Sequence, residues 1–172
     1  MTALDAVLAA FLCASVYTDL RWRKVPNAVV LAAVLLGALL RAVYGGMAGL
    51  AEGAAGLLAG LLLLVIPFAA GGIEAGDVKV LAVVGLYEGA RFAAWTFAAG
   101  AVAGGALAAA SLLARGRLGA SVRRIASHLW VAWAARRLSL ALVPPGGGEG
   151  LPAVPYTLAI VCGAAFTFFF GP

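Results

Sequence analysis

Two aspartates lie where apolar segments of the chain end or begin, and their carboxylates are the best candidates for chemistry. Asp19 closes the first apolar segment and is followed by the basic stretch 21–24. Asp77 follows the glycine-containing stretch 71–76 and precedes another apolar run. Charges that border membrane segments are costly, so each one is a functional candidate. Most of the other acids are expected to be solvated, at the outer ends of apolar runs or in a long loop: Asp5, Glu52, Glu88 and Glu149.

Two carboxylates that meet at one depth can hydrolyse a peptide bond without a metal ion. They share one proton, so the ionised one takes a proton from water and the protonated one donates a hydrogen bond to the scissile carbonyl. Gly76 would let an extended peptide backbone approach Asp77. The spacing thus predicts Asp19 and Asp77 as a catalytic pair. Two plainer interpretations stay open: Asp19 pairs with Arg21 or Arg23, or Asp77 is an ordinary helix N-cap.

The composition shows what kind of fold positions these acids. The chain has 172 residues, of which 65% are hydrophobic and 11% are charged, and its net charge is +5. Soluble domains have about 45–50% apolar and about 25% charged residues. A chain this small could not hide so much apolar surface from water, which excludes a soluble domain, a disordered chain and a nucleic-acid-binding module. We predict an all-α polytopic membrane protein with a single domain over 1–172.

Apolar runs long enough for membrane spans recur along the chain, with one short exception at 78–87. They predict about six transmembrane helices, at 3–17, 25–44, 50–70, 78–87, 92–114 and 152–170. With both termini outside, only Arg41 and Arg91 of the twelve basic residues fall outside. Basic residues favour the cytoplasmic side, so this multi-pass orientation is predicted, with Asp19 and Asp77 at the cytoplasmic face.

The segment 115–150 is predicted to be a cytoplasmic loop that contains one amphipathic interfacial helix. Its apolar stripe would lie on the membrane surface, and its arginines would contact anionic lipids. Small residues also share faces on the predicted spans, as in Gly49-x-x-x-Gly53, Gly56-x-x-x-Gly60 and Gly100-x-x-x-Gly104. Such faces let helices approach closely, either within the chain or in a homodimer.

Three motifs in order along the chain resemble those of the type IV prepilin peptidases. They are Asp19-x6-Pro26-Asn27, then Gly76-Asp77-Val78-Lys79, and the 151–156 entry to the last span. The chain's size is similar to the short branch that serves Flp-type pilins. The resemblance implies an aspartic endopeptidase of the cell inner membrane. Its partner would be a prepilin, whose basic leader is cut off at the cytoplasmic face just before the hydrophobic helix.

The resemblance also assigns roles to residues near the two acids. Asp19 and Asp77 match the family's catalytic aspartates, and no metal or cofactor is expected. Glu74 stands where the family commonly has glycine. Two roles are open for this third carboxylate: it raises the pKa of the aspartate pair, or, as we expect, it faces solvent and attracts a basic leader. Residues expected to bind substrate or shape the site are Gly76, Lys79, Glu74, Pro26 and Asn27.

One alternative comes from a different class of protein. In a membrane helper protein or a small ion-coupled transporter, Asp19 and Asp77 would be structural or ion-binding acids. Transporters usually place such groups near the membrane midplane, on broken helices and repeats. Here the acids are predicted at one boundary, and the sequence shows no convincing internal repeat.

Overall fold

The computed structural model describes residues 2–69, 73–114, 123 and 156–171. Every regular element among them is a helix, so the all-helical prediction is confirmed. The helices are α1 (Ala3–Trp22), α2 (Asn27–Ala69), α3 (Ala75–Glu88), α4 (Ala90–Ala114) and α7 (Tyr156–Phe170). The predicted interfacial helix falls in 115–150, where only Arg123 belongs to the described part of the chain.

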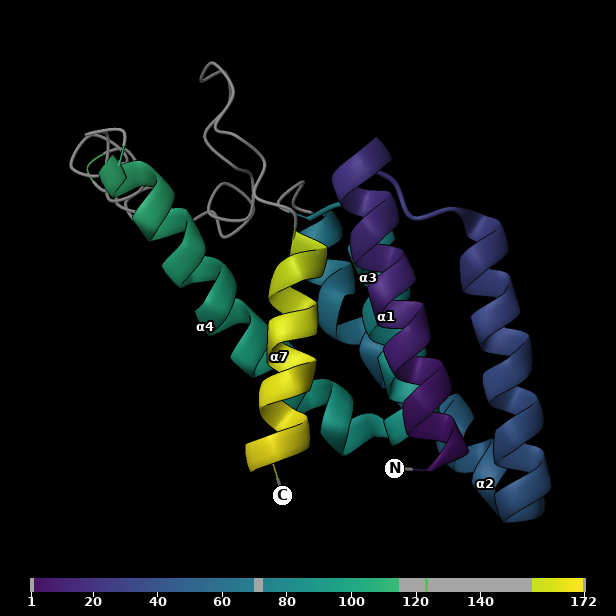
Figure 1. Cartoon of the computed structure of the whole chain (residues 1–172). Coiled ribbons are helices and arrows are strands. Elements are labelled where there is room, and N and C mark those ends of the chain that lie inside the picture. Colours follow the sequence, from purple (N-terminus) through teal and green to yellow (C-terminus); the bar gives the residue numbers. More distant parts are fainter. Residues whose placement is uncertain (1, 70–72, 115–122, 124–155, 172) are drawn as a thin grey trace.

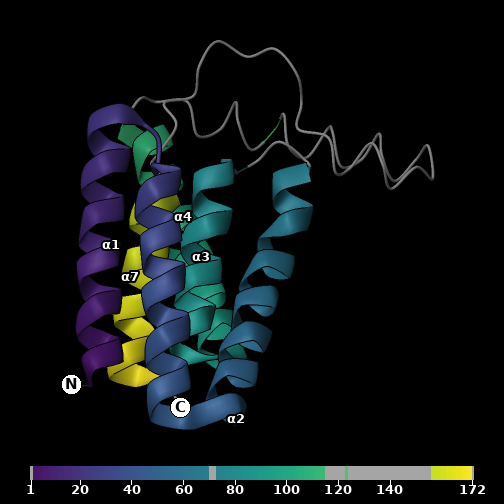
Figure 2. The ribbon, with the colours of Figure 1, turned by 90° about the vertical axis from the view of Figure 1, so that its right-hand side faces the viewer.

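The long helix α2 contains two of the predicted spans. At Gly46 its backbone leaves the helical region, with φ 59° and ψ −149°. A positive φ costs glycine little, so the chain can reverse there. Figure 2 shows the two arms of α2 diverging from this bend, with α3 between them. The break falls between the predicted runs 25–44 and 50–70.

Among the residues that the structure describes, three helices are long and apolar enough to cross a membrane, judged by length and composition: Ala3–Trp22, Asn27–Ala69 and Ala90–Ser111. The helix Tyr156–Phe170 is apolar but shorter. Large apolar side chains lie exposed on the outside of α2, including Leu31, Leu35 and Leu39. Acyl chains solvate such a surface where water would not, so the helices suit a membrane protein. The count of six spans stays a prediction.

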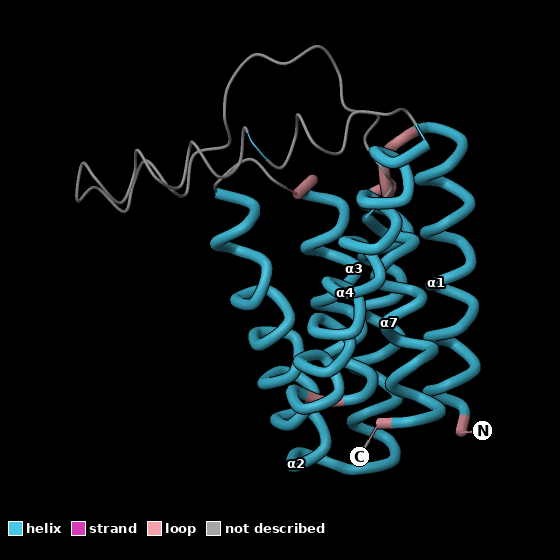
Figure 3. The backbone as a smooth tube through the Cα atoms, turned by 90° about the vertical axis from the view of Figure 1, so that its left-hand side faces the viewer, coloured by secondary structure: helices cyan, strands magenta, loops and turns pink. Residues whose placement is uncertain are grey.

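Helix α3 is the centre of the bundle. It contacts α1, α2, α4 and α7, and nearly all its residues from Asp77 to Tyr87 are buried. Its 14 residues rise about 21 Å, which is less than the roughly 30 Å of a bilayer's hydrocarbon core. The surrounding helices therefore provide the apolar environment that a longer helix would meet in lipid (Figure 3).

Glycines bring the second arm of α2 against α3. The backbones of Gly56 and Gly85 touch, and a Cβ atom on either would collide with the carbonyl oxygen of the other. A Cβ atom on Gly60 would likewise collide with the carbonyl oxygen of Leu81. A similar contact joins Gly163 of α7 to Gly100 of α4. These small-residue faces are thus used for packing within the chain.

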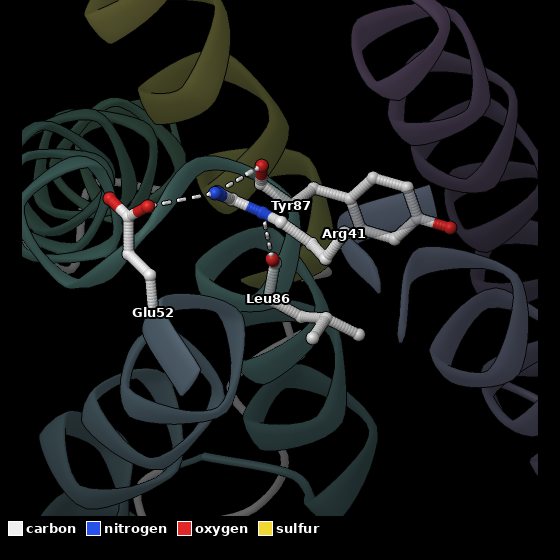
Figure 4. Close-up of polar contacts among 4 residues, drawn as sticks. All are labelled: Arg41, Glu52, Leu86 and Tyr87. Atoms are coloured by element: carbon white, nitrogen blue, oxygen red, sulfur yellow. Dashed lines mark hydrogen bonds and ion pairs between the residues drawn. The ribbon is translucent and has the colours of Figure 1, made fainter. Parts of the chain in front are cut away.

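Arg41 fastens the far end of α3, at the end of the bundle where α2 bends (Figure 4). Its Nε donates to the carbonyl oxygen of Leu86 at 3.1 Å, and Nη2 donates to that of Tyr87 at 2.7 Å. Its Nη1 pairs with Glu52 at 3.2 Å. The last carbonyls of a helix lack partners within the helix and carry partial negative charge, so a guanidinium satisfies both requirements.

We predict that Arg41→Met lowers the free energy of unfolding by about 2–3 kcal/mol, because two carbonyl groups lose a charged donor. Glu52→Gln is the matched control. The Glu52 side chain is 67% exposed, so its loss should cost less than about 1 kcal/mol. Denaturant unfolding in detergent micelles measures both. Equal losses in the two variants would show that the ion pair, and not the capping of α3, matters.

Candidate active site

Asp19 lies in the last turn of α1, which continues past the predicted boundary at residue 17. The helix ends at Arg23, whose φ of 51° is left-handed and whose N–H donates to the backbone oxygen of Asp19 at 2.7 Å. The aspartate itself is only 9% exposed. No ion pair joins it to Arg21 or Arg23 within the described segments. Its burial is therefore not explained by a neighbouring arginine.

Asp77 is the third residue of α3, and its backbone N–H donates to the carbonyl oxygen of Glu74 at 3.1 Å. Glu74 occupies the N-cap position, although its side chain makes no capping hydrogen bond. Asp77 is 4% exposed, and its Oδ1 accepts a 2.7 Å hydrogen bond from the hydroxyl of Thr157. It thus lies in the first turn of α3, and the N-cap interpretation does not describe it.

A cavity of about 380 Å³ lies between the start of α3 and the connection from α1 to α2. This end of the bundle is opposite the bend of α2 and the chain termini (Figure 1). All the residues singled out from the sequence line it: Asp19, Pro26, Asn27, Glu74, Gly76, Asp77 and Lys79. Arg23, Lys24, Val25 and Ala75 complete the lining. Residues almost 60 positions apart in the chain therefore share one site.

Lys79 connects the two sides of this cavity. Its Nζ donates to Oδ1 of Asn27 at 2.7 Å, which joins α3 to the first residue of α2. Lys79 is half-buried and Asn27 is exposed. The hydrogen bond ties the ammonium group to Asn27 at the cavity that both aspartates also line.

Gly76 precedes Asp77 and is half-buried. A Cβ atom at this position would lie 3.4 Å from Cγ2 of Val25, which is an ordinary contact. Packing of the bundle therefore does not require glycine here, in contrast to Gly56. The residue keeps the cavity wall next to Asp77 free of a side chain.

Thr157 is the member of the site that the sequence analysis missed. It comes from α7, 80 residues after Asp77, and is 1% exposed. A threonine in an apolar helix carries no distinctive signal. The nearest sequence signal is the 151–156 motif, which ends directly before Thr157.

The arrangement can activate water. Two buried carboxylates line a cavity that also holds three basic side chains and one exposed carboxylate, on Arg23, Lys24, Lys79 and Glu74. In the described part of the chain, no three or more Asp, Glu, His or Cys residues are grouped to hold a metal ion. The site and fold define a class: helical membrane proteins in which two buried acids line a cavity at one end of the bundle.

Comparison with protein families gives the chain its family. The type IV leader peptidase family matches residues 6–109, which is more than half of the sequence, so the chain belongs to this family. The resemblance seen in the motifs is confirmed, and membership indicates a peptidase, hence a hydrolase. Searches of curated proteins and of solved structures each found no significant match. The matched residues include both aspartates, whereas α7 lies beyond them.

Proposed function

We propose that this protein is an aspartic endopeptidase of the cell inner membrane that removes the basic leader from Flp-type prepilins. The observation that carries the proposal is the placement of Asp19 and Asp77, two buried carboxylates, on one cavity at one end of the bundle. Family membership supports the reaction class, because type IV leader peptidases cut leader peptides.

In the proposed mechanism the two aspartates share one proton, because two close carboxylates resist double ionisation. The ionised one takes a proton from water as the water oxygen bonds to the scissile carbonyl carbon. The protonated one donates a hydrogen bond to the carbonyl oxygen, where negative charge develops. The C–N bond then breaks as the leaving amine receives a proton from the pair. The cycle ends with both carboxylates in their starting states.

The cavity also suits the proposed substrate. Glu74 is exposed on its lining and lacks a capping bond, so its carboxylate is available to a basic leader. The hydrophobic helix of the prepilin would stay in the bilayer beside the apolar helices. Arg23, Lys24 and Lys79 surround the cavity, whereas Arg41 lies at the opposite end, and this distribution favours a cytoplasmic site.

We predict that Asp19→Asn and Asp77→Asn each abolish cleavage, because an amide can neither take nor supply the shared proton. The measurement is co-expression with a prepilin that carries a basic leader, scored by the mass of the product. Glu52→Gln, an acid-to-amide change at the other end of the bundle, should cleave like the wild type.

Membrane levels of each variant are compared by immunoblotting. Processing by both aspartate variants at the wild-type rate would refute the aspartic mechanism and favour a helper protein or a transporter. In that case the two acids would bind an ion or have a structural role.

Gly76→Ala tests how the substrate approaches the acids. The contact with Val25 allows a methyl group, so the melting temperature should match that of the wild type. Cleavage should fall by about tenfold or more, since a methyl group would separate the substrate backbone from Asp77. Gly105→Ala is the control, because no atom lies within 4 Å of its added methyl group. Unchanged cleavage in Gly76→Ala would contradict close backbone approach.

The cytoplasmic location is tested by labelling single cysteines with a membrane-impermeant maleimide. Cys13 and Cys162 are both exposed and are first changed to alanine. A cysteine at Glu52 should react in intact spheroplasts, and a cysteine at Glu74 should react only in inverted vesicles. Reaction of the Glu74 position in spheroplasts would place the cavity on the outer face.

A further inference from the structure

The hydroxyl of Thr157 donates a hydrogen bond to Oδ1 of Asp77, and the two oxygens are 2.7 Å apart. Both side chains are almost wholly buried, with 1% and 4% of their surfaces exposed. In such surroundings a hydrogen bond to a carboxyl group is stronger than in water, and its loss leaves a buried oxygen without a donor. The contact therefore has a large effect on how Asp77 is held.

The helix that carries Thr157 is rigidly packed. Ala159 and Ile160 are 0% and 1% exposed, and Gly163 lies against the backbone of α4 at Thr96 and Gly100. Thr157 is the second residue of α7, so its backbone position is fixed by these contacts. A donor on a rigid element sets the orientation of its acceptor to within a narrow range.

The hydrogen bond gives the two carboxylate oxygens of Asp77 different roles. Oδ1 accepts from Thr157, and within the described residues no side chain donates to Oδ2. A carboxyl group held by one oxygen cannot rotate freely about its Cβ–Cγ bond. The other oxygen is then left for the water molecule or the proton that passes between the aspartates.

We propose that Thr157 is a positioning residue for Asp77, and that α7 thereby completes a site whose other members lie within the family match of 6–109. This inference rests on the proposed function of the dyad. Thr157 does not touch the substrate in this role. It acts by fixing the carboxyl group that does.

Substitution of Thr157 by valine and by serine distinguishes a positioning role of the hydroxyl from simple packing of the side chain. Thr157→Val keeps the shape of the side chain and removes the hydroxyl, whereas Thr157→Ser keeps the hydroxyl and removes a methyl group. If the hydroxyl positions Asp77, the serine variant should cleave at close to the wild-type rate. The valine variant should lose about tenfold or more in kcat, with KM changed by less than about twofold. The assay uses the purified full chain in detergent with a peptide that carries a basic leader.

The opposite ranking, with valine active and serine impaired, would show that Thr157 only fills space. Equal losses of kcat in both variants would also overturn the proposal, because the serine variant retains the hydroxyl and should therefore keep a kcat close to that of the wild type. A valine variant with a raised KM and an unchanged kcat would assign Thr157 to substrate binding and would contradict the positioning role.

A thermal double-mutant cycle tests the contact independently of cleavage. Thr157→Val should lower the melting temperature of the wild-type chain. In an Asp77→Ala background it should leave the melting temperature unchanged or raise it, because the hydroxyl there has already lost its partner. Equal decreases in both backgrounds would refute the contact. If the wild type fails to cleave while the cycle shows coupling, the proposed function fails and the hydrogen bond stands.

Discussion

The backbone contact between Gly56 and Gly85 is the constraint on which the rest of the bundle depends. Lipid chains are as apolar as the side chains they meet, so helices in a membrane associate by close packing and not by escape from water. With no Cβ atom on either glycine, α2 and α3 come near enough for their backbones to touch. That contact holds the 14-residue α3 inside a sheath of longer helices. The first turn of α3 brings Asp77 with it, so the depth of the acid follows from glycine packing farther along the same helix.

Side chains from other helices hold α3 at its two ends. Arg41 of α2 satisfies the last carbonyls of α3, and Thr157 of α7 binds the carboxyl group in its first turn. Both contacts follow the rule that buried polar groups need partners, which is strict where water is excluded. The two ends of α3 differ in how their charged side chains are paired. At the Arg41 end the charge faces an exposed glutamate, whereas at the other end two acids line a cavity with no ion pair between the described residues. The Arg41 contacts and the candidate active site therefore lie at opposite ends of one helix.

The sequence predicts some features of this structure well and others not at all. Local signals suffice for Asp19 and Asp77, because an acid at the edge of an apolar run is costly and therefore conspicuous, and the structure gathers both at one cavity. The break near Gly46 was equally visible as a gap between apolar runs. Thr157 could not be found in this way, since its partner is 80 residues away and a hydroxyl in an apolar helix is common. The full length of α1 was also missed, because helical hydrogen bonds continue through its polar last turn.

The order in which the polypeptide emerges from the ribosome gives the Thr157 contact one more consequence. Both aspartates precede α7 in the chain, and Thr157 follows Asp77 by 80 residues, so the two acids are synthesised first. Synthesis proceeds from the N-terminus at about 5–20 residues per second, so a nascent chain contains both acids before α7 can dock on them. Until then Asp77 lacks its threonine donor, and the surface of α3 that α7 later covers stays open. Docking of α7 is thus the step at which a partly assembled bundle acquires the hydrogen bond between Thr157 and Asp77.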